Sequence, residues 1–175
     1  MRCNVVLMGD IDFEIASVSS EVGLSGTDRT SQWTRNEIDA SVPDREAAVR
    51  RWQFLRNLPQ LHRENDVLYV HGSPRNPLNE YVFPEDAFNL RKLQRIFMSV
   101  DHLCFVGHTH IPGVITEEGQ FLSDKEVDNV YWLDRKKTLV NVGSVGQPRD
   151  GDGRACYILH DGNSVQFRRI EYDPP

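Results

Sequence analysis

The chain has 175 residues, a formal net charge of -6 and three cysteines. This length predicts one domain, residues 1–175, with a single core. Lys and Arg are scattered among acidic residues, so we expect no nucleic acid partner, because binding of a phosphate backbone needs a basic stripe. No stretch is long enough to span a membrane, and an odd number of widely spaced cysteines is typical of buried, reduced thiols. The first apolar run is too short for a signal peptide, and we therefore expect a cytoplasmic protein with no membrane partner.

The first segment combines an apolar run with two carboxylates. Residues 4–8 are apolar and partly β-branched and are followed by Gly9, which predicts a buried strand. Asp10 and Asp12 come next, where open α/β sheets gather ligand-binding groups. A turn in which one Asp caps the following segment explains them equally well. Residues 17–30 are rich in Ser, Gly, Thr and Asp and predict a mobile loop.

Two helices and a second strand are expected next. Helical patterns cover residues 30–38 and residues 44–58, the latter with Pro43 as a start signal in the first turn. The second helix carries an apolar stripe that we interpret as core packing, formed by Ala48, Trp52, Leu55 and Leu58. Residues 66–70 predict a buried strand that ends at His71. Alone, a histidine at such a position is more often structural than a ligand.

A third buried strand, residues 103–106, leads into Gly107-His108-Thr109-His110. Two histidines at i and i+2 aim both imidazoles at one spot, as a transition-metal site requires. The preceding residues predict an irregular loop over 75–84 and a helix from Glu85 to about Met98. The buried side of this helix is expected to hold Phe88, Leu90, Leu93, Ile96 and Phe97. Strand, helix and strand in this order predict two parallel strands, with His71 and His108 at the same sheet edge.

Beyond Pro112 the sequence predicts an antiparallel meander. Its short β runs cover residues 113–116, 130–133, 138–142, 155–160 and 165–172, with a hairpin turn at 161–163. The loop of residues 141–153 contains several glycines. It is interpreted as a structural turn or as a phosphate-binding loop, and the first is favoured because no helix start follows it.

Four segments together resemble the calcineurin-like metallophosphoesterases. They are Gly9-Asp10-Ile11-Asp12, His71-Gly72-Ser73-Pro74, Gly107-His108-Thr109-His110 and the stretch from Asn141-Val142-Gly143-Ser144 to Asp152. Their order and spacing match the family from about residue 3 to residue 160. The resemblance implies an α/β (α+β) fold, a sandwich of two mixed sheets flanked by helices. It also implies metal-dependent hydrolysis of a phosphate mono- or diester, in which two divalent ions at the strand ends bind a small phosphorylated substrate and activate a water.

The resemblance also implies a set of metal ligands. His71 and His108 would bind one metal and His110 the other, while Asp10 takes the place of the Asn ligand in the family's Gly-Asn-His-Asp motif. Imidazole and carboxylate ligands suit Mn, Fe or Zn better than Ca, and these residues would hold one ion, two or none. An alternative alignment makes Asp10 the bridging ligand of the family's Gly-Asp motif. The separation between Asp10 and His71 fits the first alignment better.

Two departures from the family pattern bear on activity. Ile11 stands where the family has the His that contacts the phosphate and protonates the leaving group, so we assign no catalytic residue. The sequence contains no Asp-x-His, and the family's Gly-Asp-x-x-Asp would also lie upstream, so we expect an N-terminally incomplete domain. Three functions follow: impaired or partner-dependent hydrolysis, an inactive binding or structural remnant, or a fragment of a longer enzyme. An incomplete sandwich exposes a sheet edge, which predicts a homodimer.

Overall fold

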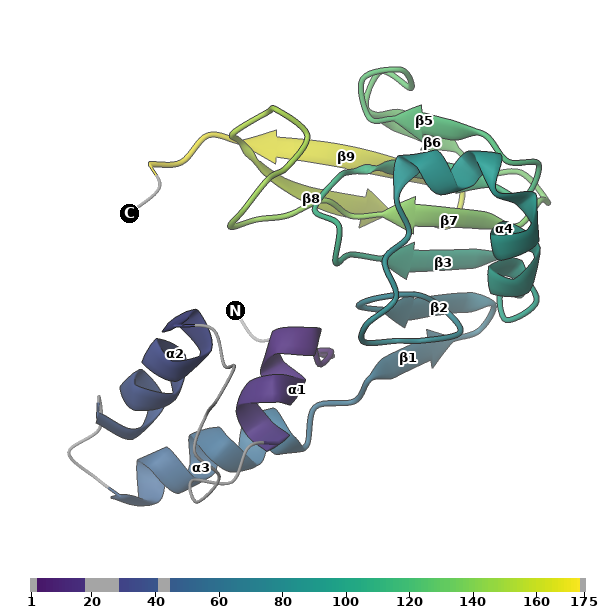
Figure 1. Ribbon diagram of the computed structural model, residues 1–175. Helices are drawn as coiled ribbons and strands as arrows, with labels where there is room; N and C mark the ends of the chain where they lie inside the picture. Colours follow the sequence, from purple (N-terminus) through teal and green to yellow (C-terminus); the bar gives the residue numbers. More distant parts are fainter. Residues whose placement is uncertain (1–2, 18–28, 41–44, 174–175) are drawn as a thin grey trace. The chain divides into compact units, whose positions relative to one another are not determined.

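The computed structural model describes residues 3–17, 29–40 and 45–173, which fall into two units, Met1–Gln60 and Leu61–Pro175 (Figure 1). The first contains the helices α1 (Asp10–Ser17), α2 (Arg29–Ala40) and α3 (Arg45–Arg56). The helices predicted over 30–38 and 44–58 are confirmed as α2 and α3. None of the helices among the described residues has the length and apolar character needed to cross a membrane.

The start of α1 differs from the sequence-based prediction. The predicted strand over residues 4–8 is wrong: no described strand pairs with this segment, and Val5 and Val6 are 43% and 40% exposed. An apolar run without a partner ladder remains irregular. Instead, the N–H of Gly9 donates a hydrogen bond of 2.9 Å to the carboxylate of Asp12, so Asp12 caps the start of α1. Of the predicted mobile loop, residues 18–28 lie outside the described residues.

Trp52 of α3 contacts three charged side chains of the first unit. Its Nε1 donates to the carboxylate of Asp39 at 2.7 Å, and the guanidinium groups of Arg35 and Arg56 lie 5.2 and 5.7 Å from its ring centroid. Cation–π contacts of this kind stabilise an aromatic ring that is only half-buried. Of the predicted apolar stripe, Ala48, Trp52 and Leu55 lie on α3 and are half-buried, while Leu58 is buried but lies beyond the end of the helix.

The second unit is built on two sheets (Figure 1). The six-stranded sheet has the order β1-β2-β3-β7-β4-β5 and the three-stranded sheet the order β6-β9-β8. The strands are β1 (Leu61–Glu64), β2 (Val67–Val70), β3 (Leu103–Val106), β4 (Gly113–Thr116), β5 (Phe121–Ser123), β6 (Val130–Trp132), β7 (Thr138–Asn141), β8 (Ala155–His160) and β9 (Ser164–Ile170). The predicted fold class, a two-sheet α/β sandwich, is confirmed. So is the parallel pairing of β2 with β3, in which Val67 lies opposite Leu103.

β3 is buried on both faces because successive side chains point to opposite sides of the sheet. Leu103 and Phe105 pack between the two sheets, against Val165 and Phe167 of β9. Cys104 and Val106 face the other way, into a core completed by Leu93, Ile96 and Phe97 of α4 (Leu90–Phe97). As expected, Cys104 and Cys156 are buried free thiols, whereas Cys3 is exposed.

Four features differ from the sequence-based expectation: the place of β7, the two edge strands and one divided helix. β7 lies between β3 and β4 and is parallel to β3, a pairing outside the expected meander; its fully buried pattern suits a central strand. β1 and β5 are additional strands at the two edges of the sheet. The expected single helix consists of the 3₁₀-helix η1 (Pro84–Phe88) and α4, because the side chain of Asn89 accepts from the N–H of Lys92 at 3.1 Å and caps a new helix.

This break explains an error in the predicted core. Phe88 and Leu90 flank the capping residue, and they are 89% and 53% exposed rather than buried. Leu93, Ile96 and Phe97 follow the cap in one regular helix and are buried as predicted. The hairpin turn over 161–163 is confirmed, with Gly162 at φ 90° between the antiparallel β8 and β9.

Candidate metal centre

His71 and His108 follow the neighbouring parallel strands β2 and β3 and lie at the same sheet edge. The N–H of Gly107 donates to the carbonyl of His71 at 2.9 Å and continues the pairing beyond the strand ends. Nε2 of His71 lies 3.0 Å from Nδ1 of His108, and the two ring planes are inclined by 57°. The structure therefore brings together these two predicted ligands.

The distance between these nitrogens fits a shared metal ion. Bonds of about 2.0–2.1 Å to a tetrahedral Zn²⁺ place two ligand nitrogens about 3.3 Å apart. The observed 3.0 Å differs from this by a few tenths of an ångström, which small ring rotations supply. His108 is buried and His71 is half-buried, so both rings have restricted freedom. The two histidines could therefore provide two ligands to a transition metal.

The turn that carries the histidines has unusual backbone geometry. His108 and His110 have φ values of 64° and 62°, in the left-handed region that is costly for residues with a side chain. The N–H of Thr109 donates to the carbonyl of Gly107 at 2.7 Å, which closes a three-residue turn around His108. A γ-turn with a positive central φ is rare and strained. The surrounding structure must therefore hold it in place.

Asn141, the last residue of β7, holds this turn. Its Nδ2 donates to the carbonyl of Gly107 at 2.8 Å and to Oγ1 of Thr109 at 2.7 Å. Its Oδ1 accepts from the N–H of Gly143 at 2.9 Å. Asn141 belongs to one of the motifs that carry the family resemblance, but sequence reasoning gave it no role. A buried amide at the end of an apolar strand was the signal that could have revealed it.

His110 turns toward the loop that follows β7. Its Nδ1 lies 2.7 Å from the carbonyl oxygen of Gln147. Because a carbonyl only accepts, Nδ1 carries the hydrogen, and in the neutral ring Nε2 keeps its lone pair. Metal-binding histidines are commonly oriented in this way by a carbonyl. His110 is thus held in the tautomer that could bind a metal through Nε2, although its hydrogen bond goes to the loop rather than to the other two histidines.

Tyr81 covers one face of His108 and was not foreseen from the sequence. The two rings are stacked with their centroids 3.7 Å apart and an interplanar angle of 21°. Phe83 stacks with Tyr81 at 5.2 Å, and Nζ of Lys92 donates to the backbone carbonyl of Tyr81 at 2.8 Å. Tyr81 lies in the loop predicted over 75–84, whose sequence gave no indication of this role. Its stacking adds to the restraint on the imidazole of His108.

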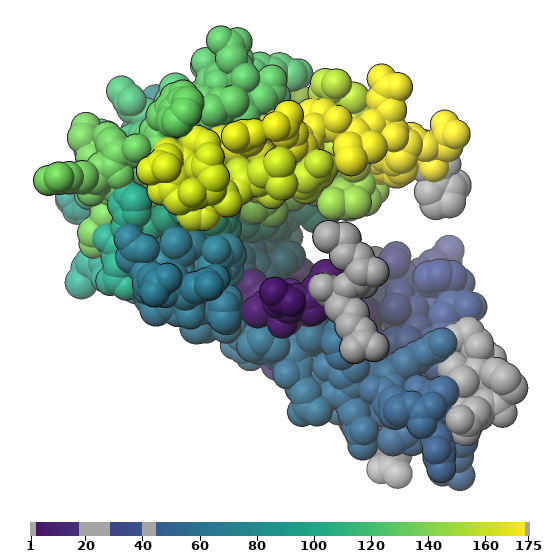
Figure 2. Space-filling view, turned by 180° about the vertical axis from the view of Figure 1, so that it is seen from behind, coloured from purple at the N-terminus to yellow at the C-terminus, as the bar shows by residue number. Residues whose placement is uncertain are grey.

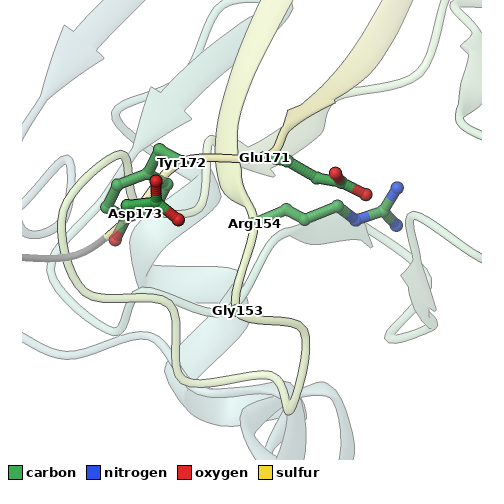
Figure 3. Close-up of a pocket in the computed structure, with 5 residues that line it drawn as sticks. All are labelled: Gly153, Arg154, Glu171, Tyr172 and Asp173. Atoms are coloured by element: carbon green, nitrogen blue, oxygen red, sulfur yellow. The ribbon is translucent and has the colours of Figure 1, made fainter.

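Asp10, the fourth predicted ligand, lies in the first unit as the first residue of α1. Its carboxylate is half-buried, while the neighbouring Asp12 is used as a helix cap. Ile11 between them is 45% exposed and offers no polar group. Figure 3 shows a separate hollow of about 500 Å³ in the second unit, lined by Gly153, Arg154, Glu171, Tyr172 and Asp173. None of the four predicted ligands lines it.

Comparison with known proteins places this arrangement in a family. The calcineurin-like phosphoesterase superfamily domain matches residues 5–164, which include all four predicted ligands. An uncharacterized protein of Methanocaldococcus jannaschii is 39% identical over 131 residues, 69% of this chain and 49% of that protein, so the chain spans about half the length of this curated relative.

Two solved structures have the same fold. The crystal structure of a metallophosphoesterase from Sphaerobacter thermophilus has a TM-score of 0.71 and 32% sequence identity, and the match covers 97% of this chain and 67% of that chain. A hypothetical protein from Pyrococcus horikoshii has a TM-score of 0.66 over 97% of this chain and 63% of its own, and at 20% identity it supports the fold alone. From the extent of the family match and these likenesses, the chain belongs to the calcineurin-like phosphoesterase superfamily.

Proposed function

We propose that this chain binds a divalent metal ion through His71, His108 and Asp10 and that it hydrolyses a phosphate mono- or diester at a low rate. The observation that carries the proposal is the convergence of His71 Nε2 and His108 Nδ1, 3.0 Å apart. Asp10 is included because it occupies a ligand position of the family motif and lies within the matched residues. Two imidazoles and a carboxylate leave a tetrahedral site one open position, as catalytic metal sites require.

The donor set restricts the metal. Imidazole and carboxylate together favour Mn, Fe or Zn. Such an ion, when bound, polarises phosphoryl oxygens and lowers the pKa of water. His110 would serve a second ion through Nε2, since its Nδ1 is bonded to Gln147. The small phosphorylated substrate would enter beside Tyr81, which is 40% exposed next to His108.

The low rate follows from Ile11. The family resemblance assigns to this position the side chain that protonates the leaving group, and an aliphatic chain carries no proton to give. General acid catalysis typically contributes roughly a hundredfold to ten-thousandfold in rate. Ile11 also favours a second candidate function, a metal-binding protein of the same fold without catalysis. A partner that supplies the missing group would restore hydrolysis.

The experiment compares metal content and hydrolysis in matched variants. Purified protein is analysed for bound metal and assayed with p-nitrophenyl phosphate and bis(p-nitrophenyl) phosphate in the presence of Mn²⁺. We expect bound metal and slow hydrolysis in the wild type, and loss of both in His108→Ala. His102→Ala is the control, because His102 directly precedes β3 and so lies at the opposite end of that strand from His108.

The outcomes separate the candidate functions. Metal without hydrolysis of either ester supports the metal-binding protein. An absence of metal in the wild type, or equal metal content in wild type and His108→Ala, overturns the proposed site. Equal losses in His102→Ala and His108→Ala would mean that the assay reports general destabilisation.

A further inference from the structure

We propose that Arg169 and Tyr172 are positioning residues for His110, which act by holding the loop after β7 in the conformation that fixes the His110 ring. The proposal rests on the proposed function only in that it treats His110 as a metal ligand. We call residues 142–154 the β7–β8 loop. Its contacts with His110 on one side and with the C-terminal strand on the other carry the argument.

Two contacts connect the β7–β8 loop with His110. The carbonyl of Gln147 lies 2.7 Å from Nδ1 of the ring, and the N–H of Arg149 donates to the backbone carbonyl of His110 at 3.2 Å. The first contact selects the tautomer, and the second fixes the backbone from which the ring projects. The position of Gln147 therefore determines which ring nitrogen of His110 carries the hydrogen.

Within the loop, the N–H of Gln147 donates to Oγ of Ser144 at 2.9 Å, and its Oε1 accepts from Nη2 of Arg149 at 3.0 Å. Three glycines of the loop add little to these contacts. A Cβ atom at Gly146, Gly151 or Gly153 would meet no other atom within 4 Å, so these glycines are not packed in place. Val145 is 65% exposed. Glycines in open space have wide conformational freedom, which must be removed by contacts elsewhere. The inner end of the loop is fixed by the N–H of Cys156, which donates to the carbonyl of Ser144 at 2.8 Å.

Arg169 of β9 anchors the outer part of the loop. Its guanidinium bridges the carboxylate of Asp150, in the loop, and that of Asp124, which follows β5. The bonds to Asp124 Oδ2 are 2.9 Å from Nε and 2.7 Å from Nη2. The side chains of Arg169 and Asp124 are only 5% and 4% exposed. A buried guanidinium with two carboxylates is held in a specific geometry, because leaving one of these charges unpaired is costly.

Tyr172 provides a second anchor three residues later. Its hydroxyl donates to the carbonyl of Gly146, the residue before Gln147, at 3.1 Å. Figure 3 shows Tyr172 and Asp173 on one side of the chain, with Arg154 and Glu171 pointing to the other. Because a hollow lies between these residues, individual contacts and not continuous packing connect the β7–β8 loop with the residues that follow β9. Figure 2 shows β9 and the residues after it, in yellow, along the surface of the second unit.

Loss of these anchors has a specific chemical consequence. When the Gln147 carbonyl leaves Nδ1, the neutral ring is free to carry its hydrogen on Nε2, and a protonated Nε2 offers no lone pair to a metal. We expect the fold and the His71–His108 pair to be unaffected by this change. Arg169 and Tyr172 thus act on one ligand through the loop and not on the site as a whole.

The test reads the His110 tautomer directly in metal-free protein. Long-range ¹H–¹⁵N correlation spectra, recorded at a pH where the ring is neutral, identify the nitrogen that carries the hydrogen. We expect hydrogen on Nδ1 in the wild type and a mixture of tautomers in Arg169→Gln and Tyr172→Phe. The controls are Arg168→Gln, an exposed neighbour on the same strand, and Tyr157→Phe on β8, both of which should keep the wild-type spectrum.

A second readout concerns the metal. Titration with Mn²⁺ should show affinity weakened by roughly tenfold at the His110 position in both variants, as found when residues that orient metal ligands are replaced. Circular dichroism establishes that each variant is folded. If Arg169→Gln does not fold, Tyr172→Phe, which removes one hydroxyl, decides the question.

The outcomes distinguish this proposal from the proposed function. A wild-type tautomer in the folded variants overturns the positioning role. Because the tautomer is read without metal, a wild type that binds no Mn²⁺ overturns the proposed function and leaves the positioning role intact.

Discussion

Asn141 and Thr109 are joined by a hydrogen bond of 2.7 Å from Nδ2 to Oγ1, with both side chains buried. The bond connects β7 to the turn that carries the histidines. It means that the candidate metal centre depends on a residue that is not itself a predicted ligand.

Replacement of this amide should weaken both stability and metal binding. In Asn141→Asp the donor is lost and a carboxylate faces the carbonyl of Gly107, so we expect the free energy of unfolding to fall by about 2–3 kcal/mol. Urea unfolding measures the stability and Mn²⁺ titration the affinity. Asn79→Asp, at an exposed position, is the control and should change neither. Equal stability of wild type and Asn141→Asp would contradict the role given to Asn141.

Ile11→His should raise activity. If Ile11 occupies the position of the leaving-group acid, an imidazole there should increase kcat by roughly a hundredfold, up to about ten-thousandfold. Ile11→Gln is the control, because an amide is polar but is no general acid. Steady-state hydrolysis of p-nitrophenyl esters by Mn²⁺-loaded protein measures the effect. Equal rates in both variants would mean that the alignment at Ile11 is wrong.

The three thiols should differ sharply in reactivity. Burial raises the pKa of Cys104 to about 12 and that of Cys156 to about 11, whereas Cys3 is exposed. Since the thiolate is the reactive form, Ellman's reagent at pH 8 should react quickly with one thiol in the native protein and with three in denaturant. Rapid reaction of Cys104 in native protein would contradict its place in the core; Cys3→Ser identifies the fast thiol.

Glu80 should contribute to stability in a defined pH range. Hydrogen bonding to Arg75 lowers the pKa of Glu80 below its ordinary value of 4.5, so the folded state favours the carboxylate more than the unfolded state does. The contribution is therefore fully present above pH 4.5 and is lost as the pH falls through the lowered pKa. We expect Glu80→Gln to be less stable by roughly 1 kcal/mol at pH 7, with no difference from the wild type once Glu80 is protonated. Thermal unfolding from pH 7 downward tests this, and Glu85→Gln at an exposed position serves as control.

The proposed homodimer is testable in solution. Val49 and Phe54 are exposed apolar residues on α3, and among the described strands β1 pairs only with β2. Exposed apolar groups and unpaired strand edges favour association. Light scattering at micromolar concentration should give twice the mass of one chain, and Phe54→Ser should weaken the association. Trp132→Ser, also exposed, is the control. A monomer at every concentration would contradict the dimer.

The ends of the two strands that carry His71 and His108 were predictable from the sequence. Runs such as residues 103–106 are apolar throughout, short, and followed by Gly, so their type and their final residue follow from local pattern. The parallel relation of β2 and β3, and hence the meeting of His71 and His108, follows from the intervening helix. The approach of the two histidines could therefore be predicted, because it depends only on the order of strand, helix and strand in the sequence.

Contacts between segments that are distant in the sequence could not be predicted in this way. The place of β7 between β3 and β4 is a pairing choice that its apolar residues permit but do not specify. Tyr81 reaches His108 from an irregular loop, and Asn89 divides a helix whose apolar spacing looked continuous. For residues 4–8, before Asp10, the error was to predict a strand that does not form, because β propensity alone does not make a strand without a partner.

The position of β7 sets the order in which the centre can form during synthesis. Asn141 bonds to Gly107, 34 positions earlier in the chain, and β7 fills the middle of the sheet. Until β7 has left the ribosome, β3 lacks one neighbour and the turn around His108 lacks its support. Closing such a long segment is entropically costly and slow compared with local pairing. The nascent chain thus carries both histidines for some time before it can hold them in the geometry that a metal requires.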